Sequence, residues 1–273
     1  MLFVQRLLKE NSWKYLLFFT AFLILGVILQ FDFQIKTGEQ CGLTVQNLYV
    51  LLWYGGEPIK VYSERAVAQV PGMWFWTHSI LYVLMLRCID RNAEHTYVWI
   101  LSQGSRSRIW NQIVYRVVIN GIIYMVLLWL ALSLAAMFRG GKAELSEEAG
   151  VIESLEGVYR HLSISTHEDG LMFWIHVFIM PMLVCMAIHM LQEVLAILNG
   201  AIISVVISFG YLFVSNFIYH WGLIGNATML ARSELLGYPA DWWKSALVCI
   251  GICITCYIVG YIRIEKEDIM ERI

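Results

Sequence analysis

Charged residues are scarce in this sequence: Asp, Glu, Lys and Arg make up 15% of the 273 residues, whereas apolar residues make up 59%. Soluble domains average about 25% charged and about 45–50% apolar residues, so a water-soluble fold could not bury this excess. Proline is rare, with four residues, and the net charge is only −2. The chain also has no basic stretch rich in aromatic residues, and we therefore expect no nucleic-acid partner.

Motifs for catalysis and for nucleotide binding are absent. The chain contains no GxxxxGK[ST], HExxH or GxSxG motif and no pair of aspartates inside facing apolar segments. We therefore predict that it is not an enzyme and binds no cofactor itself. Cys249, Cys253 and Cys256 share one helical face and are compatible with a soft-metal site, but our interpretation is helix packing, with no metal.

Long apolar runs dominate the rest of the chain. Each is about 17 to 26 residues long, the length with which a helix crosses about 30 Å of hydrocarbon. The sequence therefore predicts an all-α integral membrane protein with about six transmembrane helices, forming a single transmembrane domain over residues 1–273. The predicted spans are 15–33, 73–89, 113–138, 171–195, 201–219 and 245–262.

Basic residues predict the orientation of these spans. Arg6, Lys9 and Lys14 precede the first span, and arginines surround the connection between the second and third spans. Loops rich in Lys and Arg stay on the cytoplasmic side. We therefore expect a multi-pass protein of the cytoplasmic (plasma) membrane with both termini in the cytoplasm.

The predicted outer segments differ in character. Residues 43–53 are apolar and predict a helix lying at the membrane interface, and Trp74, Phe75 and Trp76 predict an aromatic belt. The acidic segment 139–170 is compatible with a solvated cap or with a short amphipathic helix, because Ile152, Leu155, Val158 and Leu162 recur at helical spacing. Residues 221–243 predict a glycine-containing loop that partly re-enters the membrane.

The fourth predicted span has an unusual share of soft side chains. Methionine fills irregular gaps and adapts to irregular apolar surfaces, so our interpretation is helix packing or the lining of a path for amphiphilic cargo, with a copper path as the alternative. Pro181 removes a backbone donor in the same span and predicts a kink or hinge. The candidate cargo-path residues are His176, Met182, Met186, His189 and Met190.

The predicted cytoplasmic segment 90–112 contains a short amphipathic helix. Tyr97, Val98 and Leu101 form its apolar stripe, beside polar residues such as Glu94. Such a helix is compatible with two placements, on the inner leaflet or in a groove of a cytoplasmic partner.

The arrangement resembles the permease subunit of type-2 ABC exporters. The likeness rests on the order of six spans, on Glu94-x-Thr96 followed by Ser105-Arg106 and a helix into the third span, on residues 226–232 (NATMLAR), and on the tail ending in Asp268-Ile269. The chain departs from the family pattern at His95, Gln103 and Arg116, so the likeness specifies no cargo.

The resemblance implies a transporter with several subunits. It implies a second permease chain, identical or homologous, and a separate ABC ATPase subunit that binds ATP and Mg. The cargo would be an amphiphile such as a peptide, antibiotic or lipid, moved along a path between the two permease chains, and membrane lipid would surround them. The alternative is an ATPase-independent membrane immunity or sensor protein. The residues that the likeness places in coupling to the ATPase are Glu94, Thr96, Tyr97, Val98, Leu101 and Arg106.

Overall fold

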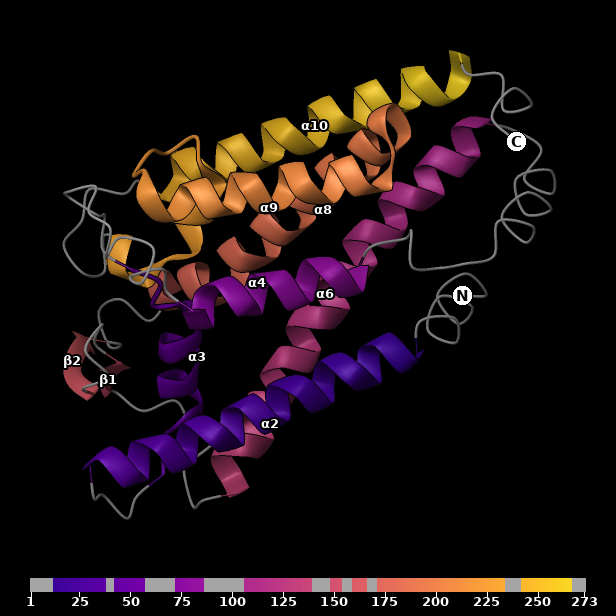
Figure 1. Ribbon diagram of the computed structural model, residues 1–273. Helices are drawn as coiled ribbons and strands as arrows, with labels where there is room; N and C mark the ends of the chain where they lie inside the picture. Colours follow the sequence, from indigo (N-terminus) through magenta and orange to yellow (C-terminus); the bar gives the residue numbers. More distant parts are fainter. Residues whose placement is uncertain are drawn as a thin grey trace.

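The computed structural model describes residues 12–37, 42–56, 72–85, 106–138, 148–153, 159–165, 171–233 and 242–266. Apart from one small hairpin and short connections, this part of the chain is helical, and the helices pack into one bundle (Figure 1). Short elements gather at one end of the bundle, which we call the capped end. The start of the first described helix and the end of the last lie at the opposite end (Figure 1).

Four helices have the length and apolarity needed to cross a membrane. At about 1.5 Å per residue, each exceeds the roughly 30 Å thickness of the hydrocarbon core. They confirm that the chain belongs to the helical membrane class. They are α2 (Ser12–Thr37), α6 (Arg106–Phe138), η3 with α8 (Ile175–Ile179 and Met180–Asn199, within the span Leu171–Asn199) and α10 (Trp242–Lys266).

Two further apolar helices follow predicted spans. α4 is described over Gly72–Met85, and the residues after Met85 lie outside the described part of the chain. α9 covers Ala201–Phe217, with 17 residues, and at 1.5 Å per residue it is about 26 Å long, less than the hydrocarbon thickness. Both fall on predicted spans, but the total of six spans stays a prediction.

The helix directions agree with a chain whose successive spans cross the membrane in alternating directions. The Tyr15 hydroxyl of α2 donates to Asn120 Oδ1 of α6 at 2.6 Å, and farther along both helices a Cβ on Gly26 would lie 2.7 Å from Ala135 Cβ. Residue numbers increase in the same direction along α2 and α6 from the first contact to the second, so the two helices are parallel. α8 and α9 are antiparallel, because they meet at the turn residue Gly200, whose φ of 89° suits glycine.

The helix α3 (Val45–Trp53) forms where the sequence predicts a helix, but its surroundings differ. The Thr44 side chain caps it by accepting from the Asn47 amide at 3.3 Å. Nearly all of its side chains are buried, and the helix contacts β1, α4, α6 and η3, so it does not rest on lipid as the interfacial prediction required. Burial raises the pKa of the Tyr49 phenol in this helix.

A β-hairpin replaces the short outer helix that was one option for the acidic segment. β1 (Glu148–Glu153) pairs in antiparallel fashion with β2 (Tyr159–Ser165), and Ile152 lies opposite Arg160. The helical spacing of Ile152, Leu155, Val158 and Leu162 was misleading, because a short segment with these apolar residues fits two short strands equally well. The option of a helix in this segment was therefore wrong.

A π-helical turn accommodates Pro181. The turn η3 (Ile175–Ile179) lies immediately before α8, and Pro181 occupies the first turn of α8. Proline lacks an amide and clashes with the carbonyl four residues earlier, here that of Val177 inside the π turn. The wider turn is the local response to the proline that the sequence predicted as a kink.

Candidate functional site

Arg232 organises the capped end of the bundle. It ends the short helix η5 (Leu230–Arg232) and is 1% exposed. Its Nε donates to the Gly56 carbonyl at 2.8 Å, and its two terminal nitrogens donate to the carbonyls of Ser215 and Asn216 at 2.5 and 2.7 Å. It also donates to Asn226 Oδ1. One guanidinium thus joins the end of α9, η4 and the segment after α3 through charge-assisted hydrogen bonds.

The C-terminus of α9 explains why the Arg232 guanidinium lies at this position. Ser215 and Asn216 belong to the last turn of α9, whose final carbonyls have no partner within the helix. A cation at a helix C-terminus satisfies these carbonyls and interacts favourably with the helix dipole. Asn226 completes this cap by donating to the carbonyls of Ile218 and His220 at 3.0 and 3.1 Å.

A second buried network joins α4 to η4 (Ile224–Thr228). Trp74 Nε1 donates to Thr228 Oγ1 at 2.8 Å, and Thr228 Oγ1 lies 3.2 Å from His78 Nε2. His78 Nδ1 faces the Trp74 carbonyl at 2.9 Å, which places a proton on Nδ1 because a carbonyl only accepts. The rings of Trp53 and Trp74 lie 5.0 and 4.4 Å from the His78 ring. Trp74 is therefore an interior side chain and not part of an aromatic belt.

Trp76 differs from Trp74 in its exposure. It is 65% exposed, on the opposite side of α4 from the buried Trp74. Of these two tryptophans from which the sequence predicted an aromatic belt, only Trp76 is on the outer surface, so the belt stays a prediction.

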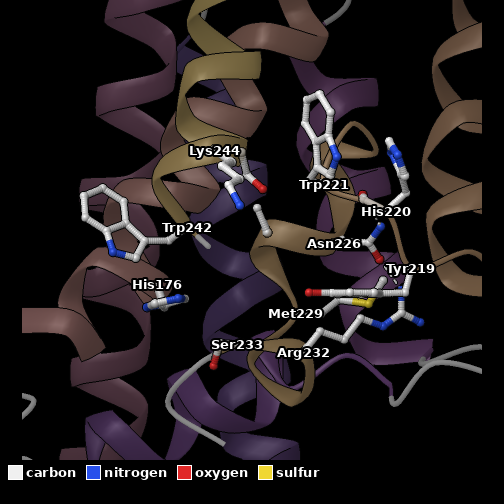
Figure 2. Close-up of a pocket in the computed structure, with 12 residues that line it drawn as sticks. His176, Tyr219, His220, Trp221, Asn226, Met229, Arg232, Ser233, Trp242 and Lys244 are labelled. Atoms are coloured by element: carbon white, nitrogen blue, oxygen red, sulfur yellow. Dashed lines mark hydrogen bonds between the residues drawn. The ribbon is translucent and has the colours of Figure 1, made fainter. Parts of the chain in front are cut away.

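A pocket opens beside the Arg232 network. It has a volume of about 180 Å³ and lies between η3, the end of α9, the η4–η5 segment and the start of α10 (Figure 2). Tyr219, His220 and Trp221 form one wall, and Trp242 and Lys244 form the other (Figure 2). The remaining lining residues are His176, Asn226, Ala227, Met229, Arg232, Ser233 and Ser245.

The pocket is cationic and aromatic in character. Lys244 is exposed and lies with its Nζ 5.3 Å from the centre of the Trp243 ring. Among the described lining residues there is no Asp or Glu.

The predicted cargo-path residues are spread along the fourth span. His176 lines the pocket and is 3% exposed, whereas the other four do not line it. Met182 packs against the main core, and Met186 faces Gly121 of α6. His189, whose Nδ1 lies 3.0 Å from Gln192 Oε1, and Met190 are buried toward the opposite end. The structure therefore brings only His176 to this pocket.

Most of the predicted coupling residues cannot be placed. Glu94, Thr96, Tyr97, Val98 and Leu101 lie outside the described residues. Arg106 is the first residue of α6. The coupling assignment accordingly stays a prediction.

Sequence reasoning missed Arg232, Trp242 and Lys244 as site residues. The run NATMLAR, residues 226–232, offered the signal, because an arginine within a mostly apolar stretch requires buried acceptors. The predicted loop 221–243 gave no role to that arginine. In the structure, residues 228–233 are buried, and they comprise the last residue of η4, the 3₁₀ turn η5 and the residues that flank η5.

Within the part of the chain that the structure describes, no three His, Cys, Asp or Glu side chains are grouped to hold a metal ion. No protein-family model, curated protein or solved structure matches the chain. The resemblance to type-2 ABC permeases therefore stays a prediction from the sequence.

Proposed function

We propose that this chain is the transmembrane subunit of an ATP-driven exporter of the type-2 ABC class. It moves an amphiphilic cargo across the cytoplasmic membrane while a separate subunit hydrolyses ATP. The chain itself holds no nucleotide motif, so force must enter through a contact with that subunit. A second permease chain, identical or homologous, completes the path.

The observation that supports this proposal best is the way the start of α6 is anchored. α6 begins at Arg106, directly after the predicted coupling segment. Four residues later, Trp110 is fully buried, and its Nε1 donates to the Tyr257 carbonyl of α10 at 2.9 Å. A Cβ on Gly260 would lie 2.2 Å from the Trp110 ring, so the indole packs directly on the α10 backbone.

This anchoring provides a path for mechanical coupling. Trp110 belongs to a cluster that also contains Met190 of α8 and Cys256 of α10. A displacement applied just before Arg106 would therefore move α6, α8 and α10 together, because packed interfaces shift as units. A transporter driven from one side of the membrane requires such a link.

The test is purification of the tagged chain from native membranes in mild detergent. We expect an ATPase subunit to co-purify and the fraction to hydrolyse ATP. The variant Tyr97→Asp/Leu101→Asp should lose this subunit, since burying each side chain contributes roughly 1.5–3 kcal/mol. The matched control Asn92→Asp/Ser102→Asp adds the same charge to the polar face and should retain it.

Two outcomes would contradict the proposal in different ways. A wild-type preparation that never contains an ATPase, and a cell whose cargo efflux is independent of ATP, would favour the immunity or sensor function. Retention of the ATPase by Tyr97→Asp/Leu101→Asp would instead show that the segment 90–105 is not the coupling element.

A further inference from the structure

The pocket at the capped end is walled by aromatic side chains. Tyr219, His220 and Trp221 contribute one wall, and Trp242 lies on the other side (Figure 2). Met229, which is 1% exposed, adds a thioether to the lining. Aromatic rings gain from offset or edge-to-face contact with other rings, and sulfur interacts favourably with the edge of a ring. These walls therefore favour an aromatic guest over an aliphatic guest of the same size.

One wall is already held in place within the protein. The Gly222 amide donates to His220 Nδ1 at 3.0 Å, and the His220 ring stacks on the Trp221 ring with centroids 5.1 Å apart and planes 29° apart. The His220 carbonyl accepts from the Leu223 amide at 2.9 Å and from Asn226 Nδ2 at 3.1 Å. Trp221 is thus fixed on its inner side although it is 56% exposed. A wall that is formed in advance lowers the entropy cost of binding.

The volume of the pocket suits a single ring. It is about 180 Å³, whereas an apolar protein cavity of about 150 Å³ is large enough to hold benzene. The pocket therefore has room for one six-membered ring with a short substituent. Binding of a neutral ring does not depend on the net charge of the lining.

We propose that this pocket binds the neutral aromatic ring of a small amphiphile. The ring lies between Trp221 and Trp242, and the polar end of the molecule stays at the opening, where the exposed indole of Trp221 suits the headgroup level of a bilayer. An aliphatic group would gain only the burial of apolar area, without the contacts between rings. The inference does not depend on the transport function proposed above.

The experiment is fluorine NMR of the purified full chain in detergent, labelled with 5-fluorotryptophan. The probes are benzyl alcohol and cyclohexylmethanol, which share a polar group and differ in the aromaticity of the ring. The signals of Trp221 and Trp242 are assigned from variants in which each is replaced by leucine. We expect benzyl alcohol to shift both signals saturably. At equal free concentration it should bind roughly two- to ten-fold more tightly than cyclohexylmethanol, the factor that one aromatic pair adds beyond area burial.

The variants locate the binding site on the structure. Trp221→Leu should weaken binding by a similar factor, read from the Trp242 signal. Ala227→Leu places a larger side chain in the lining and should abolish binding without removing a tryptophan. The matched control is Trp243→Leu, which removes a neighbouring tryptophan that is 49% exposed and is not among the described lining residues. It should leave the affinity unchanged.

Three results would overturn the proposal. Equal affinity for benzyl alcohol and cyclohexylmethanol would show that the pocket accepts any apolar group of this size. A shift that rises in proportion to the probe without saturation would show that the probe only dissolves in the detergent around the protein. Equal weakening by Trp221→Leu and Trp243→Leu would show that the ring binds to the aromatic surface and not in the pocket.

Discussion

The indole ring of Trp110 covers Gly260 so closely that no side chain could occupy that position. A Cβ on Gly260 would lie 2.2 Å from Trp110 Cζ2, well inside van der Waals contact. Because Trp110 is fully buried and also bonded to the Tyr257 carbonyl, its ring cannot move aside without losing that hydrogen bond. The contact between α6 and α10 thus requires glycine at residue 260.

A single methyl group should disrupt this contact. We expect Gly260→Ala to destabilise the protein by about 1–3 kcal/mol, the usual effect of overpacking a close helix contact. The measurement is the thermal unfolding midpoint in detergent, which should fall. The control is Gly251→Ala on the same helix, where a Cβ meets nothing within 4 Å. That variant should keep or raise the midpoint, because alanine favours helix, and an equal loss in both would contradict the close contact.

Removing the guanidinium of Arg232 should destabilise the capped end of the bundle. Arg232→Met replaces the aliphatic part of the side chain but leaves the carbonyls of Gly56, Ser215 and Asn216 without this donor. Each buried polar group that loses its partner costs about 1–3 kcal/mol, so we expect a total loss of at least about 3 kcal/mol. Limited proteolysis and thermal unfolding would measure it.

Arg232→Lys serves as the matched variant for this prediction. It keeps the charge but not the planar set of donors, so it should recover only part of the loss. Full recovery by lysine would mean that charge alone, and not the hydrogen-bond geometry, holds the cap together. Unchanged stability in Arg232→Met would contradict the role of the arginine altogether.

Cysteine labelling should report the orientation of the helices. In a chain whose only cysteine is Cys41, a membrane-impermeant maleimide should react on intact cells, because the predicted topology puts this residue outside. A chain with only Cys88 should react after permeabilisation alone. Cys185 and Cys249 are each 1% exposed and should stay unlabelled in the folded protein. Labelling of Cys88, but not Cys41, on intact cells would reverse the assignment of the two sides.

Hydropathy located the long helices but not their ends. The first predicted span, 15–33, lies inside α2 (Ser12–Thr37), and the last, 245–262, lies inside α10 (Trp242–Lys266). Most of the extra residues are polar, charged or aromatic, such as Lys36 and Trp242, and they continue the helix beyond the apolar core. The length of an apolar run corresponds to the thickness of the hydrocarbon core, whereas the helix itself continues into the headgroup level.

Long-range contacts explain what the sequence could not reveal. The hydrogen bonds from Arg232 to Gly56 and from Trp74 to Thr228 join residues more than 150 positions apart. Periodicity within one segment carries no information on such partners. For the same reason, Trp74 was assigned to a membrane belt from its neighbours in sequence, although its acceptor lies in η4.

The position of Arg232 in the chain has a consequence for biogenesis. Gly56 follows α3 early in synthesis, whereas the guanidinium that binds its carbonyl is made 176 residues later. At a synthesis rate of about 5–20 residues per second, Arg232 is added to the chain roughly 10–35 seconds after Gly56. During that interval the Gly56 carbonyl lacks its hydrogen bond from Arg232. Quality-control proteases and insertases therefore act on a nascent protein whose capped end is not yet fully formed. Closure of the cap is therefore among the last steps of its assembly.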